Sequence, residues 1–139
     1  YKRRKNEIAI VANRFNEALK GKSITEDSIR RWFSKEFLIK NKEVHQFFYE
    51  LLEKKENVYF LPAYKVFVES DKYEINYKNF NMPTLIITGE NEIGSTPRMS
   101  QDIHNEIQNS QLHIIKNAKH GVTIEKRESV NKKLSDFLF

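Results

Sequence analysis

The chain has 139 residues, of which 39% are hydrophobic and 12% aromatic, so it can bury one modest core or two small units. It contains no cysteine, which excludes disulfides and a cysteine nucleophile and favours a reducing compartment, so we expect a cytoplasmic protein. Its net charge of +5 comes from basic residues spread along the chain without an aromatic RNA-binding signature, and its apolar runs are too short to span a bilayer. We therefore expect neither nucleic acid nor a membrane as a partner.

Residues 1–71 have the apolar periodicity of helices and no strand pattern. The spacing predicts four helices, over residues 5–20, 25–33, 42–54 and 61–68. Gly21 lies where a glycine commonly ends a helix, and Thr25 is expected to cap the start of the second helix. The basic residues 2–5 are expected to form a solvated helix start rather than a binding patch.

The character of the chain changes after the connector at residues 72–81. Residues 84–88 form a short apolar run between a proline and a glycine, which is typical of a buried parallel strand. A helix, a second strand and a closing helix are predicted to follow, over residues 97–109, 111–115 and 124–139. This order is that of an α/β protein, but two parallel strands alone do not make a finished sheet. We expect either another chain or an upstream part of a larger protein to supply the rest.

An acidic group and a histidine follow the two predicted strands. Residues 90–92 hold two glutamates just after the first strand, and His120 comes shortly after the second. The carboxyl ends of parallel strands lie at one edge of a sheet, so this order places a carboxylate and an imidazole on neighbouring loops. Such a pair is two-thirds of a catalytic triad. His45, His104 and His113 have no such motif around them. No pair of histidines and carboxylates has the spacing expected of metal ligands.

Three segments resemble a known family. Residues 83–92 with Thr96-Pro97 resemble the P-T-L-V-I-x-G-x-x-D and T-P segment of α/β-hydrolase-fold enzymes, and residues 118–125 resemble the A-G-H-x-x-x-x-E segment with the triad histidine. Residues 31–37 resemble the R-W-F-T-x-x-F segment in the lid of 3-oxoadipate enol-lactonase-like hydrolases. The resemblance implies an α/β class with a partial α/β-hydrolase fold. Residues 1–80 would be the helical lid and connector, and residues 81–139 the last two βα units.

The resemblance also implies roles for the acidic group and the histidine. His120 would be the general base toward a serine, and Glu92 would orient it, although the family usually has aspartate there and Glu90 is a second candidate. None of the four glycines frames a G-x-S-x-G elbow, so the serine is expected upstream of Tyr1. The chain alone is expected to be inactive. No cofactor and no metal are predicted.

The substrate implied by the resemblance is a small carboxylic ester or an enol-lactone. Aromatic side chains of the helical part would roof its pocket, or they would only pack the helices together: Trp32, Phe33, Phe37, Tyr64 and Phe67. Arg30 and Arg31 would bind a substrate carboxylate or simply lie on an exposed helix face. Alternative functions are C–C bond hydrolysis or dehalogenation on the same fold, a non-catalytic receptor, and an inactive fragment that associates with the hydrolase half or a second copy.

Overall fold

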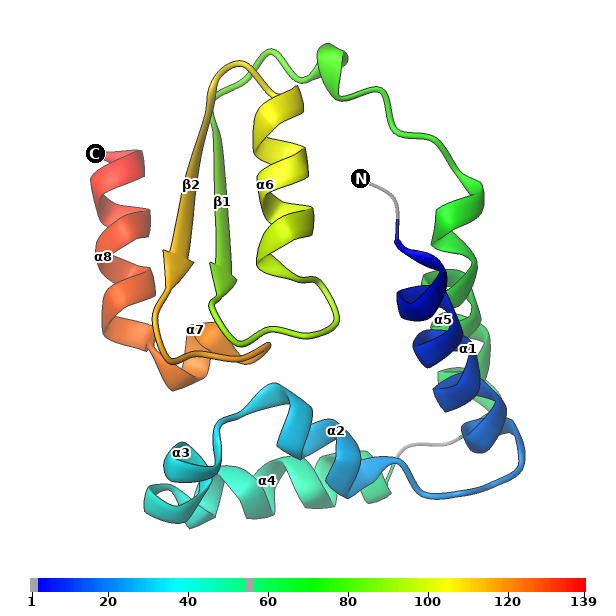
Figure 1. Cartoon of the computed structure of the whole chain (residues 1–139). Coiled ribbons are helices and arrows are strands. Elements are labelled where there is room, and N and C mark those ends of the chain that lie inside the picture. The colour runs from blue at the N-terminus through cyan, green and yellow to red at the C-terminus, as the bar shows by residue number, and fades with distance from the viewer. Residues whose placement is uncertain (1–2, 55–56) are drawn as a thin grey trace.

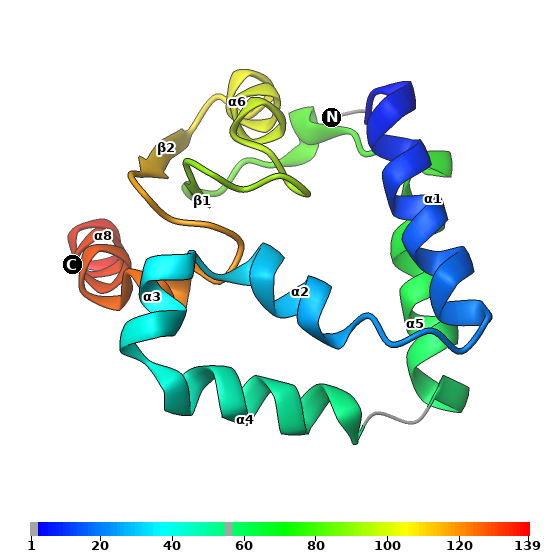
Figure 2. The same cartoon turned by 60° about the horizontal axis from the view of Figure 1, so that its bottom comes forward.

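The computed structural model describes residues 3–54 and 57–139. Helices make up the first half of the described chain, which we call the helical region. They are α1 (Lys5–Leu19), α2 (Thr25–Trp32), α3 (Lys35–Lys40), α4 (Lys42–Glu53) and α5 (Asn57–Glu69). Figures 1 and 2 show α1 lying along α5, and α2 lying along α4. The helical region therefore consists of two helix pairs joined at one corner, with the short α3 packed against α4.

The second half contains a two-stranded parallel sheet with helices on both faces (Figure 1). The 3-10 turns η1 (Ser70–Lys72) and η2 (Tyr77–Asn79) lead to β1 (Thr84–Gly89), α6 (Pro97–Glu106), β2 (Ser110–Ile115), α7 (Val122–Glu125) and α8 (Arg127–Leu138). The register pairs Thr84 with Ser110 and Gly89 with Ile115, so both strands end together. The predicted α/β arrangement of this half is confirmed.

The sheet is held by apolar side chains from both covering helices. On the α8 side Ala118, Val122 and Val130 are buried and pack against Ile87 and Ile115 of the strands. On the other side the α6 residue Met99 and the following Ile107 are buried. Because a helix covers each face of the sheet, β1 is an unbroken apolar run rather than an alternating one, and its residues are half-buried or buried.

The helical region differs in two ways from the pattern expected from periodicity. A further short helix, α3, follows α2, because Ser34 takes an extended conformation and its Oγ accepts a hydrogen bond from the Phe37 amide at 3.3 Å. Thr25 does not cap α2 either. Ile24 holds that position, and the buried Thr25 hydroxyl donates instead to Glu53 of α4. A tertiary contact has taken the side chain that was expected to cap the helix.

The closing helix is broken as well. The structure has α7 and α8 in place of one helix over residues 124–139, with Lys126 between them at φ −130° and ψ 41°. The helical periodicity of the sequence continues through this break, so the pattern alone gave no sign of it. The short α7 lies directly after His120, and it therefore belongs to the loop that carries the histidine.

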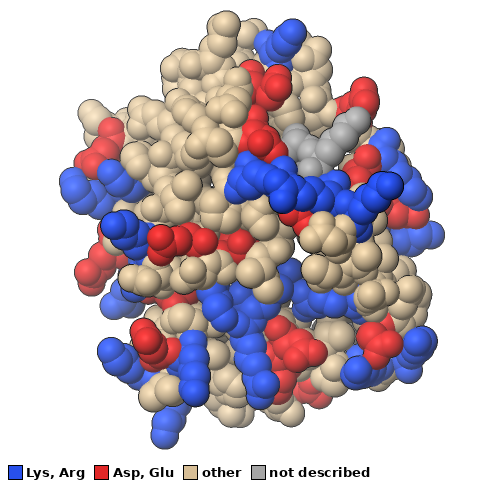
Figure 3. Space-filling model, in the orientation of Figure 1, with Lys and Arg blue, Asp and Glu red and all other residues tan. Residues whose placement is uncertain are grey.

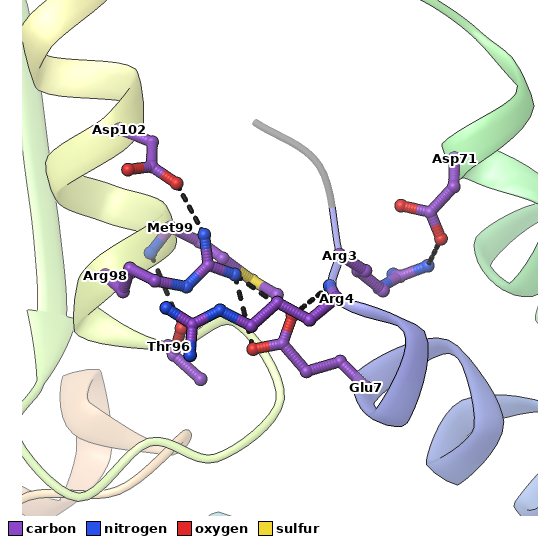
Figure 4. A network of polar contacts seen from close by, with 8 residues as sticks. All are labelled: Arg3, Arg4, Glu7, Asp71, Thr96, Arg98, Met99 and Asp102. Carbon is purple, nitrogen blue, oxygen red and sulfur yellow. Dashed lines mark hydrogen bonds and ion pairs between the residues drawn. The ribbon is translucent and has the colours of Figure 1, made fainter.

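The basic N-terminal run is not simply a solvated helix start. Lys2 lies outside the described residues, but the side chain of Arg3 is only 2% exposed. Its guanidinium donates to the Asp71 carboxylate at 2.7 Å (Figure 4). It also lies 4.4 Å from the centre of the Phe67 ring. The fold brings the start of α1 against the end of α5, and a buried cation there is stabilised by its carboxylate and its aromatic neighbour.

A second polar contact joins α1 to α6. Arg98 donates to Glu7 at 3.0 Å and to Asp102 at 2.6 Å, so one guanidinium bridges a carboxylate of each helix (Figure 4). The Arg98 side chain is 29% exposed, so we expect this bridge to fix orientation more than it adds stability.

The visible surface carries charges of both signs. On the face in Figure 3 basic and acidic side chains are interspersed, and no large area of one sign stands out. Within residues 3–54 and 57–139, no helix has the length and the apolar character that crossing a membrane requires.

Candidate active site

Glu92 and His120 contact each other at the carboxyl ends of the two strands. Glu92 lies in the loop after β1 with its side chain only 3% exposed, and its Oε2 is hydrogen-bonded to Nδ1 of His120. Its other oxygen accepts hydrogen bonds from the amides of Gly94 and Ser95, the second at 3.3 Å. The His120 side chain is 45% exposed. A buried, fully bonded carboxylate thus holds an imidazole whose second nitrogen is left for other partners.

Backbone hydrogen bonds hold the two loops together. The Glu90 amide donates to the Ile115 carbonyl at 2.9 Å, and the Asn91 amide donates to the Ala118 carbonyl at 2.8 Å. Asn117 takes the left-handed conformation with φ 52°, which turns the chain sharply after β2. The parallel register and these two bonds therefore bring the side chain of Glu92 to that of His120.

Glu90, the second candidate for the acid, faces another way. It is exposed, and its Oε2 accepts a hydrogen bond from the Asn117 amide at 3.0 Å. Glu90 therefore helps to fix the turn after β2, whereas Glu92 contacts the imidazole. The geometry favours Glu92 over Glu90 as the partner of His120.

The surroundings of Glu92 favour its ionised form. Burial raises the pKa of this carboxyl. Hydrogen bonds from His120 and from the amides of Gly94 and Ser95 lower it by a larger amount, so the net pKa lies below its ordinary value. A carboxylate that stays ionised can stabilise an imidazolium on its neighbour. That is the property a histidine needs to accept and release a proton in acyl transfer.

The lowered pKa of Glu92 predicts a pH dependence of stability. A carboxyl whose pKa is lower in the folded state stabilises the fold above its unfolded pKa, and this contribution is lost as the pH falls through the folded pKa. We expect the free energy of unfolding to decrease from about pH 5 downward, and to decrease less steeply in Glu92→Gln. Urea denaturation of both proteins at a series of pH values measures this. Equal slopes in the two proteins would contradict the assignment.

A cavity of about 270 Å³ lies beside His120. Three of the predicted substrate-binding residues, Trp32, Tyr64 and Phe67, line it together with His120. The Trp32 ring stacks on the imidazole with centroids 6.5 Å apart and planes 28° apart. Residues that the sequence did not single out complete the lining: Arg14, Ile24, Ser28, Leu52, Phe60, Gly94 and Ser95.

Phe33 and Phe37, the two other predicted substrate-binding residues, do not line this cavity. Phe33 is 1% exposed and stacks on Phe37 with centroids 5.5 Å apart. Its ring also packs against Phe48 of α4 and lies directly over Gly121. Both side chains therefore pack α2 and α3 against neighbouring elements, which is the second of the two roles expected for these aromatic residues.

The guanidinium groups of Arg14 and Arg31 face the cavity, and the sequence had indicated only Arg31 as a candidate. Arg31 lines it, whereas the Arg30 side chain is 74% exposed. Burial lowers the pKa of Arg31, the nearby Arg14 cation lowers it further, and Glu92 and Tyr64 raise it. Its Nε and the Trp32 indole nitrogen are buried without a hydrogen-bond partner among the described residues. Arg14 lies on a helix face with no motif around it, so only the tertiary structure reveals its place.

The other histidines take no part in this site. His104 is hydrogen-bonded to Ser110 at 2.7 Å, and His45 pairs with Glu26 at 3.2 Å. His113 lies within β2. Among the residues that the structure describes, no group of three or more histidine and carboxylate side chains could hold a metal ion.

The fold matches the C-terminal part of the α/β-hydrolase fold. No family model matches the sequence. The enol-lactonase from Burkholderia xenovorans LB400 is similar over 96% of this chain and 48% of its own, with a TM-score of 0.69 and 18% identity. The esterase from Exiguobacterium antarcticum is similar over 99% and 49%, with a TM-score of 0.72 and 16% identity.

A third solved structure gives the same result. The α/β hydrolase MGS-M2 from a Medee basin deep-sea metagenome library is similar over 98% of this chain and 52% of its own, with a TM-score of 0.76 and 19% identity. The chain thus spans about half the length of the solved structures that it matches. At these identities the likeness establishes the fold.

Proposed function

We propose that this chain supplies the acid and the histidine of a serine-type hydrolase that cleaves a carboxylic ester or an enol-lactone through an acyl-enzyme. The observation that carries the proposal is the contact between the buried Glu92 carboxylate and Nδ1 of His120, at the edge of an apolar cavity. The helical region would be the lid over the substrate, with residues 1–80 as lid and connector and residues 81–139 as part of the core.

Each group has a defined task in this reaction. Nε2 of His120 takes the proton of the attacking serine and returns it to the leaving oxygen. It then removes a proton from the water that hydrolyses the acyl-enzyme. Glu92 keeps the imidazole in the required tautomer and stabilises the imidazolium, without taking up the proton itself.

The serine has to come from outside this sequence. No G-x-S-x-G segment occurs in it, and the similar hydrolases are about twice as long. We propose that the nucleophile and the oxyanion-hole amides lie on an upstream hydrolase half, in one cytoplasmic polypeptide or on a companion chain. Without them the 139 residues would not turn over an ester.

The cavity favours a substrate with an apolar body and an anionic end. Trp32, Tyr64 and Phe67 provide the apolar surface beside His120. Arg14 and Arg31 add two cations: Arg14 donates to the Ser28 hydroxyl at 3.2 Å, and Arg31 lies near the Glu92 carboxylate. Since both residues are half-buried and carry positive charge, a carboxylate on the substrate would be a suitable partner for this wall.

A fluorophosphonate probe tests the serine-type assignment. Intact-mass spectrometry would be applied to the natural polypeptide, including whatever precedes Tyr1, with and without the probe. We expect a single adduct on a serine outside residues 1–139, and much slower labelling in His120→Ala, because the histidine activates the nucleophile. The control is His104→Ala, which we expect to label as the wild type does. A folded protein that gains no adduct would rule out the serine mechanism and favour a receptor role for the cavity.

A further inference from the structure

The loop that carries His120 is bonded to the end of α2 on both sides of the histidine. The Lys119 ammonium donates to the Arg30 carbonyl at 2.8 Å, and the Gly121 amide donates to the Trp32 carbonyl at 2.7 Å. These carbonyls belong to the last turn of α2, where helix carbonyls have no partner within the helix. The backbone just after His120 is therefore fixed to the helical region, and the side chain of the residue just before it makes a further contact.

Glu125, at the end of α7, adds a carboxylate that binds both segments at once. Its Oε1 accepts a hydrogen bond from the Ser34 amide at 3.1 Å, and its Oε2 accepts one from the Lys119 amide at 3.1 Å. Ser34 lies between α2 and α3, and Lys119 precedes His120. Hydrogen bonds to an ionised acceptor are stronger than those between neutral groups. One side chain thus binds the backbone of the helical region and the backbone of the histidine loop at the same time.

The position of this loop matters because Glu92 lies on the other loop, after β1, and the His120 ring must be placed so that its Nδ1 meets the Glu92 carboxylate. Glu92 is fixed by the Gly94 and Ser95 amides in its own loop, so it cannot follow a displaced imidazole. The His120 side chain is 45% exposed, and the stacked Trp32 ring itself belongs to the end of α2. Its alignment depends on where the backbone of residues 119–121 is held, and hydrogen bonds weaken steeply when misaligned.

We propose that Glu125 is a positioning residue, which sets His120 against Glu92 by holding the amides of Lys119 and Ser34 on its two oxygens. Its value for catalysis rests on the function proposed above, whereas its effect on the position of His120 does not. The effect on position can therefore be tested without any turnover.

Two substitutions break this bridge from opposite ends. Glu125→Ala removes both acceptors, and Glu125→Gln keeps one acceptor oxygen, so its effect should be intermediate. Ser34→Pro leaves the carboxylate intact but removes the Ser34 amide donor, together with the hydroxyl that caps α3. Ser34 already has φ −68° and the preceding Phe33 is extended at ψ 149°, so proline fits there without strain. Ser34→Ala is the matched control, because it loses the same hydroxyl but keeps the amide. Glu128→Ala, an exposed acid in α8, controls for charge.

Two NMR readouts on the full chain report on the loop itself. The first is hydrogen exchange of the Gly121 amide, whose own acceptor on Trp32 is unchanged in every variant. The second is the low-field proton signal of Nδ1 in His120, which depends on the bond to Glu92. In Glu125→Ala and Ser34→Pro we expect Gly121 exchange to be about tenfold faster, as the loss of one ordinary hydrogen bond would make it. We expect the low-field signal to broaden or disappear, with both controls like the wild type.

Other outcomes are equally clear. If both variants keep the low-field signal and exchange Gly121 within about twofold of the wild type, Glu125 is not a positioning residue. If Glu125→Ala fails to fold, the pair Ser34→Pro and Ser34→Ala decides the question, since neither touches the carboxylate. A failure of fluorophosphonate labelling would leave these readouts unaffected, so the two proposals can fail separately.

Discussion

Replacing Glu92 by glutamine should lower kcat of the complete hydrolase by about 10³- to 10⁴-fold, with a small change in KM. Glutamine keeps the size of the side chain but presents an amide where the structure has an ionised oxygen against Nδ1 of His120. The amide holds the imidazole in the wrong tautomer, and it cannot stabilise the imidazolium. The measurement is steady-state hydrolysis of a chromogenic ester, with circular dichroism to show that the variant is folded.

Glu90→Gln is the matched control for this prediction. It makes the same chemical change two residues away, on a side chain that is exposed and bonded to the Asn117 amide. We expect kcat to stay within about threefold of the wild type, since a surface change that keeps its hydrogen bond has a small effect. A large loss in Glu90→Gln together with normal turnover in Glu92→Gln would transfer the role of the acid to Glu90.

Replacing Gly89 by alanine should destabilise the fold by about 3 kcal/mol or more. Gly89 ends β1, and the chain after β2 crosses directly over it. A Cβ on Gly89 would lie 2.7 Å from the carbonyl carbon of Ala118 and would also overlap the carbonyl oxygens of Ala118 and Lys119. These are backbone atoms, so no side-chain rotation relieves the clash. The loop would have to move, and with it the contact between His120 and Glu92.

Gly21→Ala is the comparison for this change. Gly21 has φ +78°, so alanine is strained there, but its Cβ would meet nothing within 4 Å. We expect a cost of about 1–2 kcal/mol, which is the cost of the left-handed conformation alone. Urea denaturation of the three proteins gives both values. If Gly89→Ala were no less stable than Gly21→Ala, the close crossing of the two loops would not be required for folding.

Local patterns in the sequence predicted the second half of the fold well. An apolar run between Pro83 and Gly89 identified β1, and Thr96-Pro97 marked the start of α6, where the Thr96 hydroxyl caps the helix. These signals depend on residues that are close together in the chain. For the same reason the order of strands was enough to predict that an acidic loop and a histidine loop lie side by side.

Two errors in the helical region have the same physical cause. Thr25 and Arg3 carry side chains that local rules place at a helix cap and in solvent, but distant carboxylates, Glu53 and Asp71, bind them in the fold. At the break in the closing helix, Glu125 just before Lys126 likewise accepts a hydrogen bond from the distant Ser34 amide. Local propensity is weak, of the order of tenths of a kcal/mol per residue, so tertiary contacts override it.

The sequence by itself determined the α/β order, the parallel strands and the two loops that carry Glu92 and His120, because each follows from short-range periodicity and turn chemistry. Only the tertiary structure decided which glutamate meets the imidazole, which aromatic side chains line the cavity, and that Arg14 and Arg31 share its wall. These choices depend on how far and in which direction each side chain points once distant segments have packed. A one-dimensional pattern contains no such information until the chain has folded.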